Sequence, residues 1–247
     1  MLYLGDTSLS TAACYLAGIL HRAGYTFEYR PSDHQLNSAD LAAANDLLIL
    51  SDYPATRIST ELQQQLVERH QQGMSLLMIG GWESFQGCDG HWRGTPLGSA
   101  LPVIIATEDD RQNVDSPAFV HCEQQHPITA NLPWTERPPL IGGYNKVQAA
   151  ADTDVLLSIH RHTAEWNGTS YSLTPTTQDP LLVVRETRHS RSAALTTDLA
   201  PHWVGPLVDW GSERVTAQHP PAEGIEVGSL YVQFIEQLVG WLCEPRG

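Results

Sequence analysis

Apolar positions in the first half of the chain follow two alternating patterns. Short runs that are apolar at almost every position are typical of strands buried in a parallel sheet. These runs are residues 2–4, 46–51 and 75–79. Residues 11–23 and 60–72 instead place apolar side chains at helical spacing, and Gly24 is suited to end the first helix. Because strands and helices alternate, we predict an α/β fold with a doubly wound, mostly parallel sheet and helices on both faces.

The second half of the chain is less regular. Four short segments have the composition of strands, and the second of them is expected to pair antiparallel. They are residues 102–105, 155–159, 181–184 and 193–197. Residues 229–242 are predicted to form a long closing helix. No linker-like stretch interrupts the sequence, so we predict a single domain over residues 1–247, with some antiparallel additions to its sheet.

Composition narrows the classes of partner. The chain has a net charge of -14 and Lys146 is its only lysine, which argues against nucleic acid because phosphate binding needs concentrated Lys and Arg. No apolar segment is long enough to span a bilayer, and no secretion signal opens the sequence. The cysteines form no CxxC pair, which favours reduced thiols in the cytoplasm. A homo-oligomer is compatible with these features.

The turn after residues 75–79 marks the expected site. Gly80 and Gly81 allow a sharp backbone bend there, and ligands of open α/β sheets collect just beyond such strand ends. A nucleophile-elbow enzyme carries Ser or Cys at the apex of this turn. Here the apex is Trp82, which has no nucleophilic atom. The sequence therefore predicts a pocket without the usual chemistry.

Three aspartates also follow predicted strands: Asp6, Asp52 and Asp198. Since parallel strands present their carboxyl ends on one edge, we expect these side chains and Trp82 to converge around one cleft. Such carboxylates can bind a cation, an amine or sugar hydroxyls. They can equally cap helices or order turns, as Asp commonly does. The sequence leaves both interpretations open.

Several short motifs resemble the class I glutamine amidotransferase-like superfamily, and more narrowly its uncharacterised bacterial members. They are Gly5-Asp6-Thr7-Ser8, Ser51-Asp52-Tyr53, Gly80-Gly81-Trp82, Gly143-Tyr144-Asn145 and Thr197-Asp198. The resemblance implies a flavodoxin-like fold. Active superfamily members carry a cysteine in a Gly-x-Cys-x-Gly turn and a supporting His-x-Glu pair. Neither occurs at the corresponding places here, so we expect no glutaminase activity.

Other residues near the turn offer an alternative, a hydrolase of different mechanism. Glu83 is a candidate general base if burial raises its pKa, and Ser84 is a nucleophile only if a histidine lies beside it. Cys88 and His91 lie three residues apart in a glycine-rich loop, where catalytic geometry is rarely held. His160 and His162, on one strand face, are a possible metal pair, but solvent-facing histidines are the favoured interpretation. We expect no metal and no cofactor.

The leading hypothesis is a protein that binds a small polar ligand or a partner at the carboxyl edge of the sheet. A regulatory or structural subunit is a third possibility, and the sequence does not decide whether the protein is an enzyme. Trp203 is either a second aromatic wall opposite Trp82 or a core residue. The predicted binding residues are Asp6, Ser8, Asp52, Gly80, Gly81, Trp82, Asp198 and Trp203.

Overall fold

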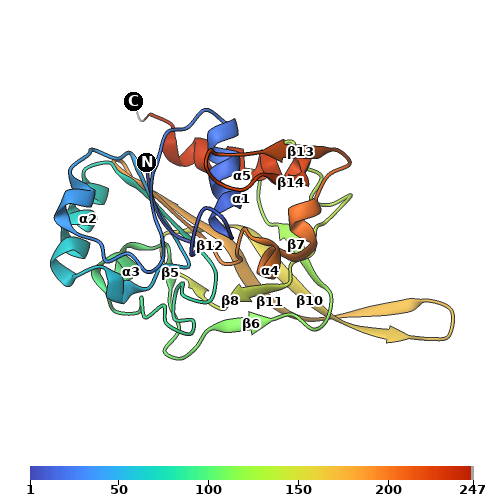
Figure 1. Ribbon diagram of the computed structural model, residues 1–247. Coiled ribbons are helices and arrows are strands. Elements are labelled where there is room, and N and C mark those ends of the chain that lie inside the picture. Colours follow the sequence, from blue (N-terminus) through green and yellow to red (C-terminus); the bar gives the residue numbers. More distant parts are fainter. Residues whose placement is uncertain (246–247) are drawn as a thin grey trace.

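An eight-stranded sheet runs through the computed structural model, which describes residues 1–245 (Figure 1). Five neighbouring strands pair in parallel. In spatial order they are β2 (Glu28–Arg30), β1 (Leu2–Gly5), β3 (Leu47–Ser51), β4 (Ser75–Ile79) and β12 (Arg191–Leu195). Three antiparallel strands continue the sheet from β12. They are β11 (Tyr171–Glu186), β10 (Asp154–Trp166) and β7 (Ala118–Cys122). The predicted α/β class, with a mostly parallel sheet and antiparallel additions, is confirmed.

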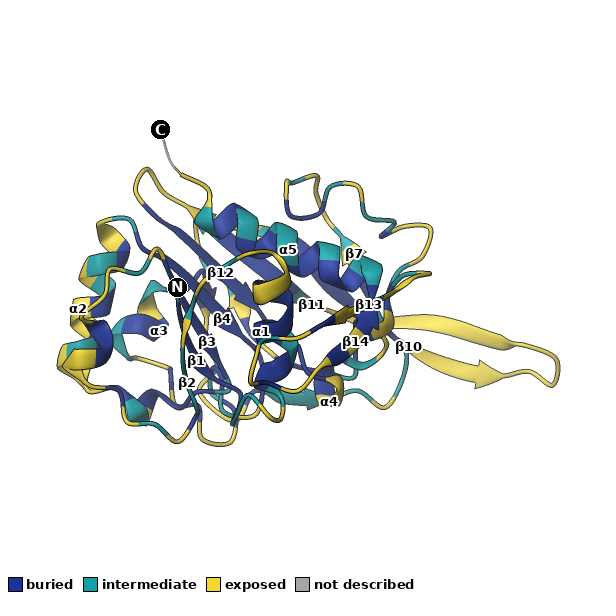
Figure 2. Cartoon of the chain, turned by 45° about the horizontal axis from the view of Figure 1, so that its top comes forward, coloured by how far each residue is buried: buried dark blue, intermediate teal, exposed yellow. Residues whose placement is uncertain are grey.

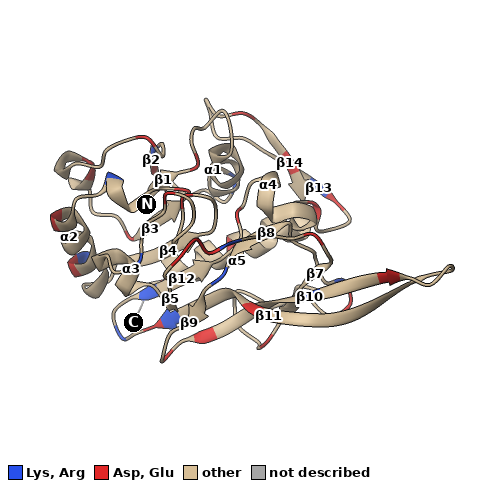
Figure 3. Ribbon diagram, turned by 90° about the horizontal axis from the view of Figure 1, so that it is seen from below, with Lys and Arg blue, Asp and Glu red and all other residues tan. Residues whose placement is uncertain are grey.

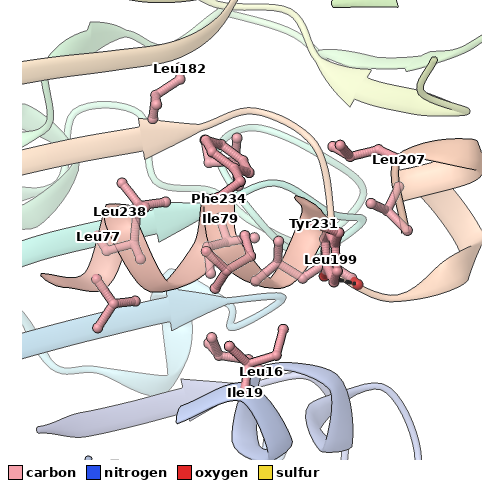
Figure 4. Close-up of a cluster of buried hydrophobic side chains, with 14 of the residues drawn as sticks. Leu16, Ile19, Leu77, Ile79, Leu182, Leu199, Leu207, Tyr231, Phe234 and Leu238 are labelled. Carbon is pink, nitrogen blue, oxygen red and sulfur yellow. Dashed lines mark hydrogen bonds between the residues drawn. The ribbon is translucent and has the colours of Figure 1, made fainter. Parts of the chain in front are cut away.

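The central strands are apolar throughout because both faces of the sheet are covered. On one face, Leu77 and Ile79 of β4 belong to a core that includes α1 (Ala13–Arg22) and α5 (Ser229–Cys243). Figure 4 shows side chains of both helices gathered against these strands. On the other face, alternate residues such as Met78 belong to a core that includes α2 (Thr60–Gln71) and α3 (Pro96–Ala100). Successive side chains of each strand thus point alternately into the two cores, as expected for a sheet covered by helices on both faces.

Helix boundaries lie within two residues of those predicted. The helix expected from residue 11 begins at Ala13, and its N-cap Ala12 supplies no side-chain cap. The Ser8 hydroxyl bonds instead to the hydroxyls of Ser10 and Thr11. In α2, the Ser59 hydroxyl accepts a hydrogen bond from the backbone N–H of Leu62, so this helix has the side-chain cap that the first lacks.

Smaller elements surround the main sheet. The strand predicted at residues 102–105 exists as β5 (Val103–Ile104), but it pairs with β9 (Gln148–Ala149) outside the large sheet. Two further pairs are β6 (Arg111–Asn113) with β8 (Gly143–Asn145), and β13 (Arg214–Ala217) with β14 (Ile225–Gly228). The short helices are α4 (Pro201–Val204) and the 3-10 turns η1 (Ser38–Leu41), η2 (Ala55–Arg57) and η3 (Gly205–Asp209). Within residues 1–245, no helix is long and apolar enough to cross a bilayer.

Strands β10 and β11 extend far beyond the segments that the sequence predicted. Their outer halves leave the sheet as a two-stranded ribbon that projects into solvent (Figure 2). Pairing continues to Trp166 and Tyr171 at its tip. Only residues 155–159 and 181–184 carried the signal of a buried strand, because the outer halves face solvent and alternate polar with apolar residues.

Helix α5 also fixes a loop at the carboxyl edge of the sheet. The hydroxyl of buried Tyr231 donates a hydrogen bond of 2.7 Å to the carbonyl oxygen of Leu199 (Figure 4). Leu199 lies in the loop that connects β12 to α4. A buried carbonyl without this donor would lose a partner that water cannot replace.

We therefore expect Tyr231→Phe to lower the free energy of unfolding by about 1–3 kcal/mol, the usual cost of an unsatisfied buried acceptor. Chemical denaturation monitored by circular dichroism measures this change. Tyr15→Phe is the matched control: within residues 1–245, the half-buried Tyr15 hydroxyl has no hydrogen-bond partner. If both variants lose equal stability, the bond to Leu199 is not what holds the loop.

Candidate functional site

Four residues singled out from the sequence share one edge of the sheet. Asp6 follows β1, Asp52 follows β3 and Trp82 lies just after β4. Asp198 follows β12, and these four strands are parallel neighbours. Asp6 and Asp198 are 3% and 6% exposed, however, so they lie beneath the surface of this edge rather than in an open cleft. Asp52 is half-buried, and Trp82, 43% exposed, is the accessible member of the set.

Burial makes the three carboxyl groups hard to ionise together. It raises the pKa of Asp6 well above the usual range, and the nearby Asp198 and Asp52 raise it further. Burial also raises the pKa of Asp52 to about 7, with Asp198 adding to the effect, and the pKa of Asp198 to about 6. Burial and the neighbouring like charges therefore both disfavour full ionisation of the three groups.

Each carboxyl group also has a structural partner. Asp6 accepts hydrogen bonds from the hydroxyls of Tyr3 and Ser51, the latter at 3.0 Å. Asp52 accepts from the backbone N–H of Glu83 at 2.8 Å, and Asp198 accepts from that of Ala200 at 3.0 Å. These bonds order turns, as one interpretation of the sequence proposed. Turn ordering and a raised pKa therefore coexist in the same side chains.

Backbone strain accompanies this arrangement. Asp6, Thr7 and Asp52 have φ angles of 53°, 58° and 45°, in the left-handed region that residues with a Cβ seldom adopt. Aspartate tolerates this region better than most residues, whereas β-branched Thr7 tolerates it poorly. Such conformations cost free energy and concentrate at functional sites.

Paired glycines let the turn after β4 pass very close to its neighbours. A Cβ at Gly80 would lie 2.1 Å from the carbonyl oxygen of Thr196, which is backbone and has little room to move. A Cβ at Gly81 would lie 2.0 Å from Oδ1 of Asp52 and would push that carboxylate aside. Glycine is therefore required at both positions for steric reasons.

A buried amide clamps the same turn. The side chain of Asn145, on β8, accepts a hydrogen bond of 2.9 Å from the N–H of Gly81 and donates one of 3.1 Å to its carbonyl oxygen. The amide also donates to Oδ1 of Asp110 at 2.7 Å, and Oδ2 of Asp110 accepts from the N–H of Gln86 at 2.9 Å. Burial raises the pKa of Asp110 to about 6.

The sequence alone gives little sign of this clamp. Asn145 stands out only within a family motif, and Asp110 lies several residues into the polar loop that follows the strand predicted at residues 102–105. The clamp depends on tertiary contacts, because Asn145 bonds to Gly81 and Asp110 bonds to Asn145 across distant parts of the chain.

Trp82 forms the accessible surface of the site together with two cationic or aromatic neighbours. The guanidinium of Arg111 lies 4.6 Å from the centre of the Trp82 ring, a cation–π distance. The exposed ring of His202 is 5.7 Å away. Arg111 is also paired with Asp109 at 2.7 Å.

Two predicted binding residues are less accessible. Trp203 is 1% exposed, its ring packs over Gly143, and its Nε1 donates to Oδ1 of Asn113 at 2.9 Å. The structure thus places Trp203 in the core, packed on Gly143, and its ring offers no open face opposite Trp82. Ser8 is half-buried at the start of the loop before α1.

The candidate nucleophiles are not arranged for catalysis. The buried Ser84 hydroxyl donates to the carbonyl oxygen of Ile79 at 2.6 Å and accepts from the N–H of Asp52 at 3.0 Å. Within residues 1–245 it has no histidine partner. Cys88 and His91 are exposed, and the nearest acidic contact of His91 is Asp89 at 4.0 Å. Glu83 is half-buried, and burial raises its pKa.

The β-bulge opposite His160 and His162 places its extra residue in β11, so the two histidines keep the predicted alternation along β10. The ring of His160 stacks on that of His121 at 3.8 Å, and the ring of His162 packs against Phe119 at 5.4 Å; His121 and Phe119 are two residues apart on β7, so both histidines lie on one face. Within residues 1–245, no group of three or more His, Cys, Asp or Glu side chains could hold a metal ion.

A cavity of about 750 Å³ lies on the far side of the clamp. Its lining includes Asp110, Lys146 and Asp179, and Nζ of Lys146 lies 3.5 Å from Oδ1 of Asp179. The exposed Ile104 contributes an apolar wall. The cavity thus combines both signs of charge with apolar surface, and the only lysine of the chain lies in it.

The raised pKa of Asp52 predicts a pH-dependent loss of stability. A carboxyl that binds its proton more tightly when folded stabilises the fold fully below about pH 4, and this contribution is lost as the pH rises to about 7. As the pH rises from about 4 to about 7, the free energy of unfolding of Asp52→Asn should therefore rise by roughly 1–3 kcal/mol relative to that of the unsubstituted protein. Thermal unfolding between pH 4 and 8 measures the difference. Asp115→Asn, at a side chain 87% exposed, is the control; a parallel pH profile for the two variants would contradict the assignment.

Comparisons with known proteins agree with this architecture. The chain is similar over 98% of its length to the cytoplasmic protein STM3548 from Salmonella typhimurium, with 22% identity, a TM-score of 0.73 and 98% of that chain covered. It is similar to the cytoplasmic protein STM1381 from Salmonella typhimurium LT2, with 20% identity, a TM-score of 0.72 and coverage of 98% and 99%. These likenesses show the fold alone. No curated protein matches the sequence.

A family match covers most of the chain. The family described as "Putative glutamine amidotransferase" matches residues 7–216, which include β2 through β12, the glycine turn, Asp52 and Asp198. The resemblance inferred from short motifs is thereby confirmed. The chain belongs to this glutamine amidotransferase-like family.

Proposed function

We propose that the protein binds a small polar ligand at the carboxyl edge of its parallel sheet and does not hydrolyse glutamine. The observation that carries the proposal is the half-buried Asp52, with a pKa of about 7, beside the exposed Trp82. A carboxyl that is partly protonated near neutral pH can accept or donate a hydrogen bond, and the Trp82 ring offers a flat surface. The ligand class that fits is a small molecule rich in hydroxyl or amino groups.

Strand order supports this location. Numbered alone, the parallel strands β2, β1, β3, β4 and β12 follow the order 2-1-3-4-5, which is the flavodoxin-like arrangement. Ligands of such sheets bind where the strand order reverses, between the first and third strands. Asp6 and Asp52 follow those two strands. On this proposal, residues 1–247 act as one domain built around that edge.

Electrostatics supports the same ligand class. Repulsion between buried carboxylates destabilises the fold when more than one of three groups is ionised: Asp6, Asp52 and Asp198. An ammonium group or several hydroxyl donors at Asp52 would offset this cost, because either would stabilise the ionised carboxylate. A role confined to ordering turns would be served as well by a neutral amide such as Asn.

Loss of glutaminase activity follows from the residues at the turn and after β12. The position of the expected nucleophile holds Trp82, and Asp198, Leu199 and Ala200 follow where a His-x-Glu pair would support a thiolate. Of the described cysteines, Cys88 lies in the loop beyond the turn and is exposed. The four cysteines are free, which fits the cytoplasmic location that we also propose.

A hydrolase is the second candidate, and Asp52 is the residue that favours it. A carboxyl with a pKa of about 7 is suited to general acid–base catalysis at neutral pH. The backbone N–H of Glu83 bonds to this carboxyl, and burial raises the pKa of the Glu83 side chain as well. Two such groups could serve a water-activating mechanism that needs neither Ser84 nor Cys88.

Purified protein should release no ammonia from glutamine, and Trp82→Cys should not create this activity, because no His-x-Glu pair follows β12 to support the new thiolate. A coupled ammonia assay is the measurement. Cys88→Ala is the control for any background due to the exposed native thiol. Glutamine-dependent release by the unsubstituted protein would contradict the non-glutaminase proposal.

Ligand binding can be tested with two panels of probes, neutral sugars and primary amines. We expect at least one class to raise the melting temperature and to change the Trp82 fluorescence. Asp52→Asn should weaken binding about tenfold or more, the effect of one lost charge-assisted hydrogen bond. Asp115→Asn, at an exposed carboxyl paired with Arg161, should leave it unchanged. Binding that is equally strong in both variants, or absent for both panels, would contradict the proposed site.

A further inference from the structure

The ribbon formed by the outer halves of β10 and β11 is apolar on one face and polar on the other. The register pairs Ala164 with Leu173 and Trp166 with Tyr171, so these four side chains share a face. The rings of Trp166 and Tyr171 are 5.0 Å apart, which agrees with that placement. Cross-strand partners on the opposite face are all polar: Thr163 with Thr174 and Glu165 with Ser172.

The apolar face of the ribbon is exposed to solvent. Trp166, Tyr171 and Leu173 are 57%, 68% and 45% exposed. They make up three of the five large hydrophobic side chains that are exposed within residues 1–245, and the others are Trp82 and Ile104. An isolated two-stranded hairpin is marginally stable in water, and a contiguous apolar patch marks an interaction site.

One edge of the ribbon is also open. Strand β7 pairs with β10 only as far as Arg161, and β12 pairs with β11 only from Leu182 onward. Single backbone hydrogen bonds continue to His162 and Leu181, and farther out neither ribbon strand pairs with an outer strand within residues 1–245. Pro175 interrupts the outer edge of β11, whereas residues 163–166 of β10 contain no proline. The tip of β10 therefore keeps backbone groups that can pair with another strand.

Charge indicates which partner fits this surface. Between residues 162 and 178 the only Asp, Glu, Lys or Arg is Glu165, although the whole chain has a net charge of -14. Figure 3 shows the projecting ribbon largely free of charged residues. A strongly charged partner such as nucleic acid or an anionic membrane would find no complementary charge here. A second copy of this chain, otherwise repelled by its own acidity, can approach through this nearly neutral segment.

We propose that the ribbon is the dimerisation surface of the protein, and that two ribbons pack with their apolar faces against each other about a twofold axis. A twofold contact is self-complementary, so one apolar face suffices to cover the other. The three half-exposed large side chains bury roughly 100 Å² each on contact, or about 600 Å² over both copies. A stable interface needs on the order of 1,200 Å² or more, so Ala164 and neighbouring side chains of both copies must supply the rest. The dimer is consequently weak, in the micromolar range.

Sedimentation velocity over a concentration series tests the proposal. We expect the unsubstituted chain to dimerise reversibly, and Trp166→Ser combined with Leu173→Ser to weaken dimerisation at least ~30-fold, as for loss of a hot spot. The matched control is Thr163→Ser combined with Thr174→Ser, which alters the polar face of the same ribbon and should leave the dimer intact.

Both double variants should keep the melting temperature of the protein, because the ribbon contributes to neither core. A chain that stays monomeric up to millimolar concentration would overturn the proposal. Equal dissociation of the two double variants would overturn it too, as would a dimer that persists without Trp166 and Leu173. None of these outcomes depends on ligand binding at Asp52, which lies at the edge of the sheet.

Discussion

The close approach of the turn after β4 to its neighbours is the constraint on which the site depends. Gly80 lies against the carbonyl oxygen of Thr196, and Gly81 lies against the carboxylate of Asp52. Any side chain at either position would separate β4 from the loops beside it. The side chain of the buried Asn145 bonds to both backbone groups of Gly81 and to Asp110, and these bonds hold the turn in place. Trp82 projects from a rigid base as a result.

Electrostatics at this edge follows from the same packing. Because the strands bring Asp6, Asp52 and Asp198 together under cover, burial and mutual repulsion raise their pKa values, while the hydrogen bonds to each group limit the rise. The same side chains therefore order the loops and remain sensitive to a ligand. This edge of the sheet therefore holds carboxyl groups behind the exposed ring of Trp82.

The ribbon shows a different balance of forces. Within the sheet, β10 and β11 are apolar on both faces because helices or loops cover them. Beyond the sheet, the strands keep their pairing but lose those neighbours, and near the tip of the ribbon their sequence alternates apolar with polar residues. No part of the described chain covers the apolar face of the ribbon, and the proposed second copy of the chain would cover it. Site and ribbon thus use separate parts of the chain, since neither ribbon face contributes to the carboxyl edge.

Local patterns determined the strands and helices of the first half, because apolar runs and helical spacing act over a few residues. They also determined that Asp6, Asp52, Trp82 and Asp198 share an edge, since parallel strands all end on the same side. Only the tertiary structure decided that Asp6, Asp198 and Trp203 are buried, that Ser84 holds the turn, and that Asp110 and Asn145 clamp it. These depend largely on contacts between residues far apart in the chain, such as Ser84 with Asp52 and Asn145 with Asp110, for which one sequence carries no local signal. The length of the ribbon was equally hidden, because a strand pair in solvent lacks the apolar run that marks a buried one.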